Sequence, residues 1–406
     1  MGGYDFLQGI RVLEVAQLGP SSLGGYLADM GAEVIKVEGL DGDPLRHTST
    51  PAVGAADGAS LLHLRWNRGK KSVGLDLKTE AGARLFRDLA EKSDVVIEGM
   101  RAGVLDRLGL GYETLRELNP RIVFCSISGL GRSGPYCRLG SHGPSFDAFG
   151  GLSSKNPYGL SPEERARTDW APIGMHAMGL NAALGTLAAV VRAQRCGQGA
   201  LIEVTGAESA AHWLPEGVDA VLNEPLLHTR PGFYNSAGRM AGWPRLNTYQ
   251  TLDGFGIFFQ GFFPKFWKRF CSVVERPDLA ARYESGDDIA LVDEQIHQEL
   301  SAIFATRRRD EWMAIFLEYD VPGGPANMLR DLATDPHFLA RHNIYEVEYP
   351  GIGKLRLAST PVKTPGQTFA PTLAPTQWQH SAEVLGKLLG IDGDELERLK
   401  KNRVVY

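Results

Sequence analysis

The segment IRVLEVAQLGPSSLGGYLADMGAEVIKVE, residues 10–38, decides the fold class. It begins with the β-branched run IRVLEVA and ends with EVIKVE, and the stretch LGGYLADMGA between them has a helical pattern. Short β-branched runs bounded by turn residues are typical of strands. A strand, a helix and a second strand in this order predict a βαβ unit, in which both strands lie parallel in one sheet. The segment therefore predicts an α/β protein.

The rest of the chain divides into regions of different character. Two more strand-like runs, DVVIEG and RIVFCSISG, follow at 94–99 and 121–129, and a helical pattern covers 79–92. A segment rich in Gly, Pro and Ser at 131–175 predicts a long surface loop, a kind of segment that often carries function. Between 225 and 335 the strand-like LDGFGIFFQGFF is accompanied by amphipathic helical segments. We therefore predict a large domain from residues 1–224 and 336–406, and a smaller α+β domain from residues 225–335.

Composition restricts the function classes. The 406 residues are 43% apolar, carry a net charge of -5 and have no long run of like charges, so neither nucleic acid nor an acidic membrane surface is expected as a partner. Four scattered cysteines, without a C-x-x-C pair, predict neither a disulfide framework nor a zinc site. No leader sequence and no apolar run approaching about 18 residues is recognised, so we expect a cytoplasmic protein.

The stretch APIGMHAMGLNAALGTLAAVVRAQRCGQG, residues 171–199, predicts a long helix. Leu180, Leu184, Leu187 and Val191 recur at helical spacing, so we expect an apolar stripe that is mostly buried, ending near Gly197. The start of a helix favours an acidic side chain or a bound anion. In the last two positions before the expected helix the sequence instead has Met175 and His176.

Successive motifs along nearly the whole chain resemble those of the family III CoA-transferases. In order they are LQGIRVLEVAQLGP, LADMGAEVIKVE, WNRGKKSVGLDLKTEAG, GVLDRLGLGYETLRELNPRIVFCSISGLGRSGPY, GTLAAVVRAQRCGQGALIEV, RDEWMAIFLEYDVPGGPANMLRDLATDPHF and EVLGKLLGI. The family includes formyl-CoA and carnitine CoA-transferases and the α-methylacyl-CoA racemases. The resemblance implies a Rossmann-like large domain, a small domain, and two subunits that interlock like linked rings.

The resemblance also implies a site for coenzyme A, or for acyl-CoA as substrate, without a metal. Its lining would include Gln17, Leu18, Leu75, Gly99, Met100 and Arg107. The match is partial, because the family often has Asn-Phe-Arg-Pro-Gly where this chain has GMRAG at 99–103. Without the resemblance, Arg107 could equally be a surface cation and Leu75 a core residue.

The chemistry that the resemblance implies needs an aspartate nucleophile. Its carboxylate attacks the donor thioester, forms a mixed anhydride and becomes an enzyme-bound CoA thioester before CoA passes to the acceptor acid. The motif places this aspartate four residues before Gly179, where this chain has Met175. Three other residues are candidates for a nucleophile or base: Asp169, six residues upstream, His142, near the place where the racemases have a histidine, and His176.

Three functions remain open on this evidence. The first is a non-catalytic subunit that pairs with a homologous, aspartate-bearing CoA-transferase subunit, as in heteromeric family members such as succinyl-CoA:benzylsuccinate CoA-transferase. The second is a stand-alone transferase or acyl-CoA epimerase that uses Asp169, His142 or His176. The third is an acyl-CoA-binding pseudoenzyme without turnover.

Overall fold

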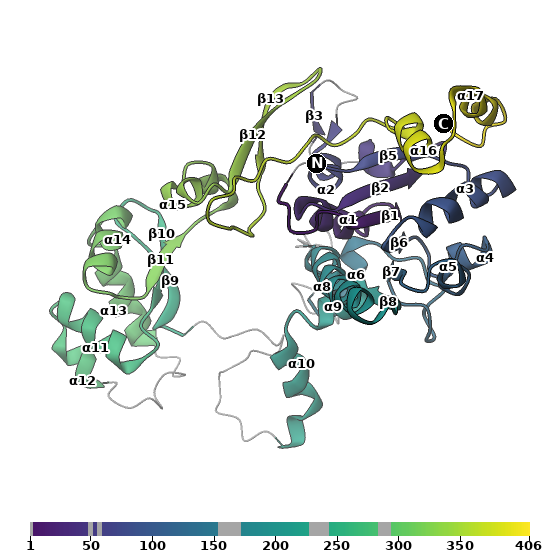
Figure 1. The fold of residues 1–406 in the computed structure, drawn as a ribbon. Helices are drawn as coiled ribbons and strands as arrows, with labels where there is room; N and C mark the ends of the chain where they lie inside the picture. The colour runs from purple at the N-terminus through teal and green to yellow at the C-terminus, as the bar shows by residue number, and fades with distance from the viewer. Residues whose placement is uncertain (1–2, 48–51, 55–58, 153–171, 227–242, 283–293) are drawn as a thin grey trace, which may run out of the picture. The chain divides into compact units, whose positions relative to one another are not determined.

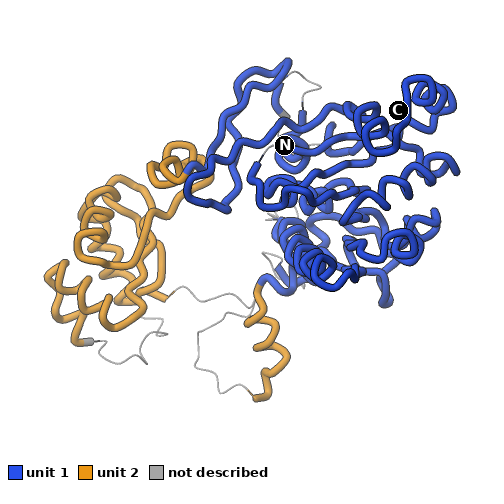
Figure 2. The backbone as a smooth tube through the Cα atoms, in the orientation of Figure 1, with its two compact units in different colours: residues 1–213, 342–406 blue, residues 214–341 orange. Residues whose placement is uncertain are grey.

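The computed structural model describes residues 3–47, 52–54, 59–152, 172–226, 243–282 and 294–406, which fall into two compact units (Figure 2). Unit 1 comprises residues 1–213 and 342–406, and unit 2 comprises residues 214–341. The domain boundaries expected from the sequence, after residues 224 and 335, stay a prediction; the compact units divide the chain after residues 213 and 341.

Unit 1 is built on a six-stranded sheet in which all strands are parallel (Figure 1). The strand order is β5-β2-β1-β6-β7-β8. The strands are β1 (Arg11–Ala16), β2 (Glu33–Glu38), β5 (Lys71–Gly74), β6 (Val95–Gly99), β7 (Val123–Ser128) and β8 (Ala200–Thr205). The α/β prediction is confirmed, and β5 and β8 are two edge strands that the sequence analysis did not identify. Two short strands, β3 (Ala52–Val53) and β4 (Ala59–Ser60), pair outside this sheet.

Helices cover both faces of the sheet, because successive strand residues alternate between two apolar clusters. On one face Leu13 and Val15 pack with helices α3, α4, α5, α16 and α17, and on the other Val12 and Ala16 pack with α1, α6, α8 and α9. These helices are α1 (Ser21–Asp29), α3 (Glu80–Glu91), α4 (Val104–Arg107), α5 (Tyr112–Leu118), α6 (Gly143–Phe149), α8 (Ile173–Cys196), α9 (Gly206–Ala211), α16 (Ser381–Leu389) and α17 (Gly393–Lys401). Helix α2 (Leu61–Asn67) precedes β5.

The C-terminal segment returns to unit 1, as Figure 2 shows. After the hairpin of β12 (Ile344–Tyr349) and β13 (Gly353–Ala358), helices α16 and α17 join the cluster around Leu13. Val405 forms a bridge with Leu75, and the Tyr406 N–H donates to the Gly74 carbonyl at 3.1 Å. The chain end therefore closes over the end of β5.

Helix α8 corrects the expectation that its leucine stripe is buried. Leu184 is 72% exposed and Leu180 is 48% exposed, so the predicted leucine stripe is not buried in this chain. The opposite face of the helix consists of small residues that allow close packing: a Cβ atom on Gly179 would lie 2.2 Å from Ser22 Oγ of α1. By length and composition α8 could also cross a membrane, with an 18-residue window of mean hydropathy 1.4, but it packs against β7, β8, α1 and α9 as a core helix does.

Unit 2 combines an antiparallel sheet with helices around an aromatic core. The sheet has the order β11-β10-β9, and the core packs Trp267, Phe270, Phe304 and Phe316 around Phe259. The elements of this unit are α10 (Pro215–Leu222), β9 (Leu246–Gln250), β10 (Gly256–Gln260), α11 (Pro264–Val273), α12 (Pro277–Arg282), α13 (Glu294–Phe304), α14 (Arg309–Glu318), β11 (Gly323–Ala326) and α15 (Pro336–Ala340).

The topology of unit 1 indicates where a ligand would bind. From β1 the chain proceeds outward through β2 to β5, and then returns to β6 on the other side of β1 before continuing to β7 and β8. The strand order therefore changes direction between β1 and β6. In parallel sheets of this kind a crevice forms outside the carboxyl ends of the strands at that point.

Candidate functional site

A cavity of about 570 Å³ lies at the carboxyl ends of β1, β6 and β7. The segments that follow these strands line it, together with the starts of α6 and α8. The lining comprises residues 17–20, 99–102, 127–131, 139–144, Leu45, Leu62, Trp66, Cys137, Phe146, Met175 and Met178. Its position at the change of strand direction and its largely apolar wall with few polar groups are typical of ligand sites.

The charged and titratable side chains of this wall are few. They are Arg101, Cys137 and His142, and no aspartate or glutamate occurs among the described residues that line the cavity. The wall therefore offers cationic and hydrogen-bonding groups to an anionic ligand, but no carboxylate to attack one.

The loop between β1 and α1 forms one side of the cavity. Leu18 has a φ of 54°, a left-handed conformation that a branched side chain rarely adopts and that often marks a functional site. Gly19 follows, and a Cβ atom there would lie 2.7 Å from Met175 Cγ and 2.6 Å from Met178 Cε. Only a glycine at this position allows α8 to approach the loop so closely.

Four of the six residues expected to contact CoA line this cavity: Gln17, Leu18, Gly99 and Met100. Gly99 allows the strand end to contact the β1–α1 loop, since a Cβ atom on it would lie 2.4 Å from Pro20 Cβ.

The other two expected contacts lie outside the cavity lining. Leu75 is 1% exposed and packs in the core cluster of α3 and α16, because its strand ends beneath the C-terminal segment. Arg107 is an exposed residue at the end of α4, with Nη1 3.7 Å from the position of a Cβ atom on Gly103.

Arg101 lines the cavity and was not singled out from the sequence. It follows β6, and its Nη2 lies 3.0 Å from the position that a Cβ atom on Gly140 would occupy, so its guanidinium group lies beside the loop that leads to α6. Arginine forms paired hydrogen bonds with phosphate groups. The sequence did contain a signal, because Arg101 belongs to the GMRAG segment. Only Gly99 and Met100 of that segment were assigned to the CoA site.

Met175 lies in the first turn of α8 and lines the cavity. The helix begins at Ile173, four residues earlier than expected, so Met175 and His176 belong to the helix rather than to the approach. The Met175 side chain contacts the β1–α1 loop at Gly19, and its Sδ lies 3.8 Å from the position of a Cβ atom on Gly143 at the start of α6. The thioether of Met175 therefore occupies the position on the cavity wall at the start of α8.

A carboxylate from another element serves the N-terminus of α8. Asp147 of α6 is 1% exposed, and its Oδ1 accepts a hydrogen bond from the Gly174 N–H at 2.7 Å. No partner within the described chain is found for its buried Oδ2. Burial raises the pKa of Asp147, although the hydrogen bonds from Gly174 and Ile173 oppose the shift. Asp147 does not line the cavity, so it fixes the helix start rather than facing a ligand.

The two candidate histidines have different surroundings. His142 precedes α6, lines the cavity and is exposed, and its backbone N–H donates to Ser145 Oγ at 3.0 Å. His176 is half-buried, with its ring edge-on to Trp66 at a centroid distance of 5.5 Å. Burial, assisted by the nearby Arg65 cation, lowers the pKa of His176. Only the first of these imidazoles lines the cavity.

Asp169, the remaining candidate nucleophile, lies outside the described residues. Within the described parts of the chain, no group of three or more His, Cys, Asp or Glu side chains could hold a metal ion.

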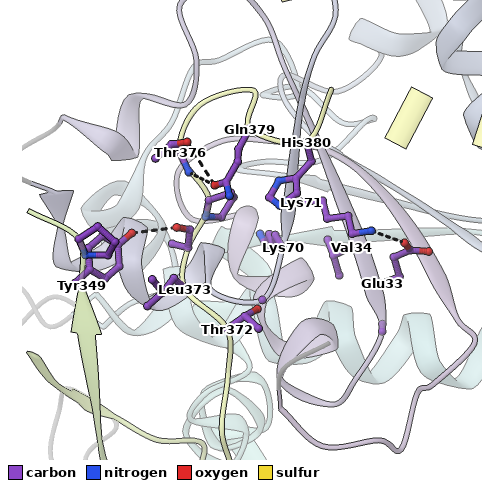
Figure 3. A pocket seen from close by; sticks show the side chains of 15 residues that line it. Glu33, Val34, Lys70, Lys71, Tyr349, Thr372, Leu373, Thr376, Gln379 and His380 are labelled. Atoms are coloured by element: carbon purple, nitrogen blue, oxygen red, sulfur yellow. Dashed lines mark hydrogen bonds and ion pairs between the residues drawn. The ribbon is translucent and has the colours of Figure 1, made fainter. Parts of the chain in front are cut away.

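A second cavity, of about 610 Å³, lies at the amino ends of β2 and β5 (Figure 3). Its half-buried cation, Lys71, is held between Glu33 at 3.1 Å and Glu383 at 2.7 Å. The Tyr349 hydroxyl donates to the Ala374 carbonyl at 3.0 Å. Because these groups already satisfy one another, we place the functional site in the first cavity.

Comparisons with known proteins identify the family of the chain. The sequence matches the family described as CoA-transferase family III over residues 7–381. It is 32% identical to the succinyl-CoA–L-malate CoA-transferase alpha subunit of Chloroflexus aurantiacus, covering 98% of this chain and 92% of that protein. It is 29% identical to the beta subunit of that name from the same organism, covering 98% of each. The crystal structure of an aspartate-to-alanine mutant of Rv3272, a Mycobacterium tuberculosis protein, matches with a TM-score of 0.78 and 25% identity, covering 95% of this chain and 100% of that one. The chain belongs to CoA-transferase family III.

Proposed function

We propose that this chain is the non-catalytic subunit of a CoA-transferase that moves CoA from an acyl-CoA, such as succinyl-CoA, to a carboxylic acid. One observation carries the proposal: the cavity has no carboxylate among its described lining residues, and Met175 fills the place that the family resemblance gives to the aspartate nucleophile. The nucleophile would come from a homologous, aspartate-bearing subunit.

Acyl-CoA is the substrate of the family, and several features of the cavity suit it. Arg101 can pair with a phosphate group, while Gln17 and the apolar Leu18 and Met100 can line the path of the pantetheine arm. Gly99 lets the end of β6 pack closely against Ala16 and Pro20. In this proposal the chain binds and orients acyl-CoA and excludes water, and it performs no covalent step.

The covalent steps would take place on the partner subunit. Its aspartate carboxylate attacks the donor thioester, and CoA thiolate leaves as a mixed anhydride forms. The thiolate then attacks the aspartyl carbonyl of the anhydride, which releases the donor acid and leaves CoA bound to the aspartate as a thioester. The acceptor carboxylate attacks that thioester, which releases CoA thiolate and forms a second mixed anhydride. The thiolate attacks the acceptor carbonyl of this anhydride, which gives the new acyl-CoA and restores the aspartate carboxylate.

Pairing with a homologous chain is supported by two observations. Both an alpha and a beta subunit of one named transferase are among the relatives. The exposed Leu180 and Leu184 of α8 form an apolar face that a second subunit could cover. We propose the interlocked arrangement of linked rings for this pair, in the cytoplasm, where the four cysteines would stay reduced.

The acceptor acid is proposed from chemistry shared with relatives. The names of the two Chloroflexus subunits pair succinyl-CoA with L-malate, a dicarboxylic acid. (R)-Benzylsuccinate, the acceptor suggested by the sequence resemblance, is a dicarboxylic acid with an added aromatic ring. Both acids belong in the first substrate panel.

The experiment is a CoA-transfer assay with succinyl-CoA and this panel, using the chain purified alone and co-expressed with an aspartate-bearing homologue. Activity only in the pair is the expected result. Turnover by the chain alone would contradict the proposal. Loss of that turnover in Asp169→Asn, His142→Ala or His176→Ala would then identify the residue of a stand-alone transferase or epimerase. Acyl-CoA binding without turnover in any pair would instead indicate a pseudoenzyme.

A further inference from the structure

Two buried lysines lie beneath the β1–α1 loop and share one carboxylate. Lys36 of β2 and Lys70, which directly precedes β5, have side chains with no exposed surface, as does Glu14 of β1. Lys70 Nζ lies 2.9 Å and 2.8 Å from the two carboxylate oxygens of Glu14, and Lys36 Nζ lies 3.1 Å from Oε1. Lys36 is also paired with Asp43 at 2.9 Å.

The same two ammonium groups bind both ends of the loop. Lys36 Nζ donates to the Ala16 carbonyl at 2.5 Å, where the loop begins, and to Ser21 Oγ at 3.1 Å. Lys70 Nζ donates to the Ser21 carbonyl at 2.8 Å, where the loop ends. Residues 17–20, which line the cavity, are therefore held between two cations that are joined through Glu14.

The loop has a conformation that needs such support. Leu18 is in the left-handed region, which persists only where the surrounding structure imposes it. Helix α1 is held close as well, because a Cβ atom on Gly24 would lie 1.8 Å from Glu14 Oε2. An apolar trio in place of the three ions would avoid their desolvation, but it would leave the Ala16 and Ser21 carbonyls without these donors.

We propose that Lys36 and Lys70 are positioning residues for the acyl-CoA site: they fix the β1–α1 loop in the conformation that receives the ligand. The inference rests on the proposed function, because it takes the cavity to be the acyl-CoA site.

The two lysines differ in how they respond to pH. Burial lowers the pKa of Lys70 to about 8, although Glu14 opposes the shift. Burial also disfavours the charge of Lys36, but Asp43, Glu14 and Glu38 outweigh it and raise its pKa. The groups that face Lys70 are Glu14 from β1, Lys36 from β2, Asp43 from the segment after β2, and Ser21 from α1. Above about pH 8, therefore, the Ser21 carbonyl loses its charged donor, whereas Lys36 keeps its contacts with the Ala16 carbonyl and Ser21 Oγ.

The pH dependence of stability and of binding distinguishes a positioning role of Lys70 from a merely structural role. The pKa of Lys70 is lower in the folded chain than in the unfolded chain, so above about pH 8 the unfolded chain retains a proton that the folded chain has lost. The contribution of Lys70 to the free energy of unfolding therefore increases with pH in this range. If Lys70 positions the loop, affinity for acyl-CoA falls over the same range.

The test measures binding of acetyl-CoA to the full-length chain by isothermal titration calorimetry at about pH 7 and about pH 9, since the probe has no free thiol to titrate. We expect wild-type affinity to fall about tenfold between the two pH values, and Lys70→Met to bind about tenfold more weakly than wild type at pH 7 without further pH dependence. Lys71→Met is the matched control. It changes the adjacent lysine, whose partners Glu33 and Glu383 lie away from the loop, and it should bind as wild type does.

The outcomes separate the two proposals. A wild-type chain that does not bind acetyl-CoA at either pH overturns the proposed function, and with it this inference. Wild-type binding that is independent of pH overturns the inference alone, as does a folded Lys70→Met variant with wild-type affinity. Ser21→Ala removes the hydroxyl contact of Lys36 together with the hydrogen bond that the hydroxyl donates to the Ala16 carbonyl at 3.1 Å, and leaves both lysines in place. It is the milder second variant, and we expect it to weaken binding about threefold.

Discussion

Replacing Met175 with aspartate should place a nucleophile on a cavity wall that has no carboxylate among its described residues. Met175 is in the first turn of α8, and its side chain lies between Gly19 and Gly143 on the cavity wall. An aspartate carboxylate at this position would face the cavity from the place that the family resemblance assigns to the nucleophile. We expect Met175→Asp to give CoA transfer by the chain alone.

The cost in stability is small enough for the variant to fold. Met175 is half-buried and packs at the edge of the cluster formed by α1, α6 and α8, so removing its thioether should cost about 1–2 kcal/mol of unfolding free energy. A carboxylate in the first turn of a helix offsets this by about 0.3–1 kcal/mol. The net loss of about 1 kcal/mol is a minor part of the roughly 5–15 kcal/mol typical of folded domains.

The assay follows transfer of CoA from succinyl-CoA to L-malate and to benzylsuccinate by chromatography of the acyl-CoA products. Met175→Asn is the matched control, because it has the same size and helix position without a nucleophilic carboxylate. Met175→Asp that is folded, binds acyl-CoA and still has no activity would refute the placement of the nucleophile. Equal activity of Met175→Asn would refute the claim that the introduced carboxylate acts as the nucleophile.

Three further predictions concern single residues. Arg101→Ala should weaken acyl-CoA binding about three- to tenfold in calorimetry, because it removes a guanidinium group from the cavity wall. Arg107→Ala, at the exposed end of α4, should weaken binding less. Equal losses of affinity would contradict this assignment. Burial raises the folded-state pKa of Asp147, so acidification should stabilise the wild type relative to Asp147→Asn. Asp147→Ala should lose about 1 kcal/mol of unfolding free energy, because it removes the carboxylate that caps α8. Urea titrations at several pH values would measure both effects. Burial lowers the pKa of His63 to about 4, so the unfolding free energy should fall by up to about 3 kcal/mol as the pH drops from about 6.5 towards 4, and His63→Asn should remove most of this pH dependence.

The central sheet could be predicted from the sequence because its inner strands are short, mainly apolar runs that contain β-branched residues. RVLEVA and VFCSIS are buried on both faces, and their composition shows it. The edge strands gave a weaker signal: β5 has only four residues, KSVG, and β8 alternates between exposed and buried positions. The register between these strands is set by tertiary pairing, which no local pattern contains.

Helix α8 shows where periodicity is insufficient. The spacing of Leu180, Leu184 and Val191 correctly identifies a helix with an apolar face, but it does not say what covers that face. The small residues on the other side, Gly179 among them, decide the packing because they allow the helix backbone to approach α1.

The sequence analysis named cavity-lining residues that belong to contiguous motifs. It missed contacts between segments that are distant in the sequence. Gln17 and Gly99 belong to such motifs, and both line the cavity. Asp147 and Gly174 are 27 residues apart on two helices, and only the fold brings the carboxylate to the helix start. Lys70 likewise reaches the β1–α1 loop through the pairing of β5 with β2, not through its neighbours in sequence.

The central claim is that this chain binds acyl-CoA but provides no nucleophile, and intact-protein mass spectrometry tests it most directly. The complex with the aspartate-bearing subunit would be incubated with succinyl-CoA, denatured to separate the chains and weighed. We predict a CoA thioester on the partner subunit alone, sensitive to hydroxylamine. A hydroxylamine-sensitive CoA adduct on a carboxylate of this chain would contradict the claim.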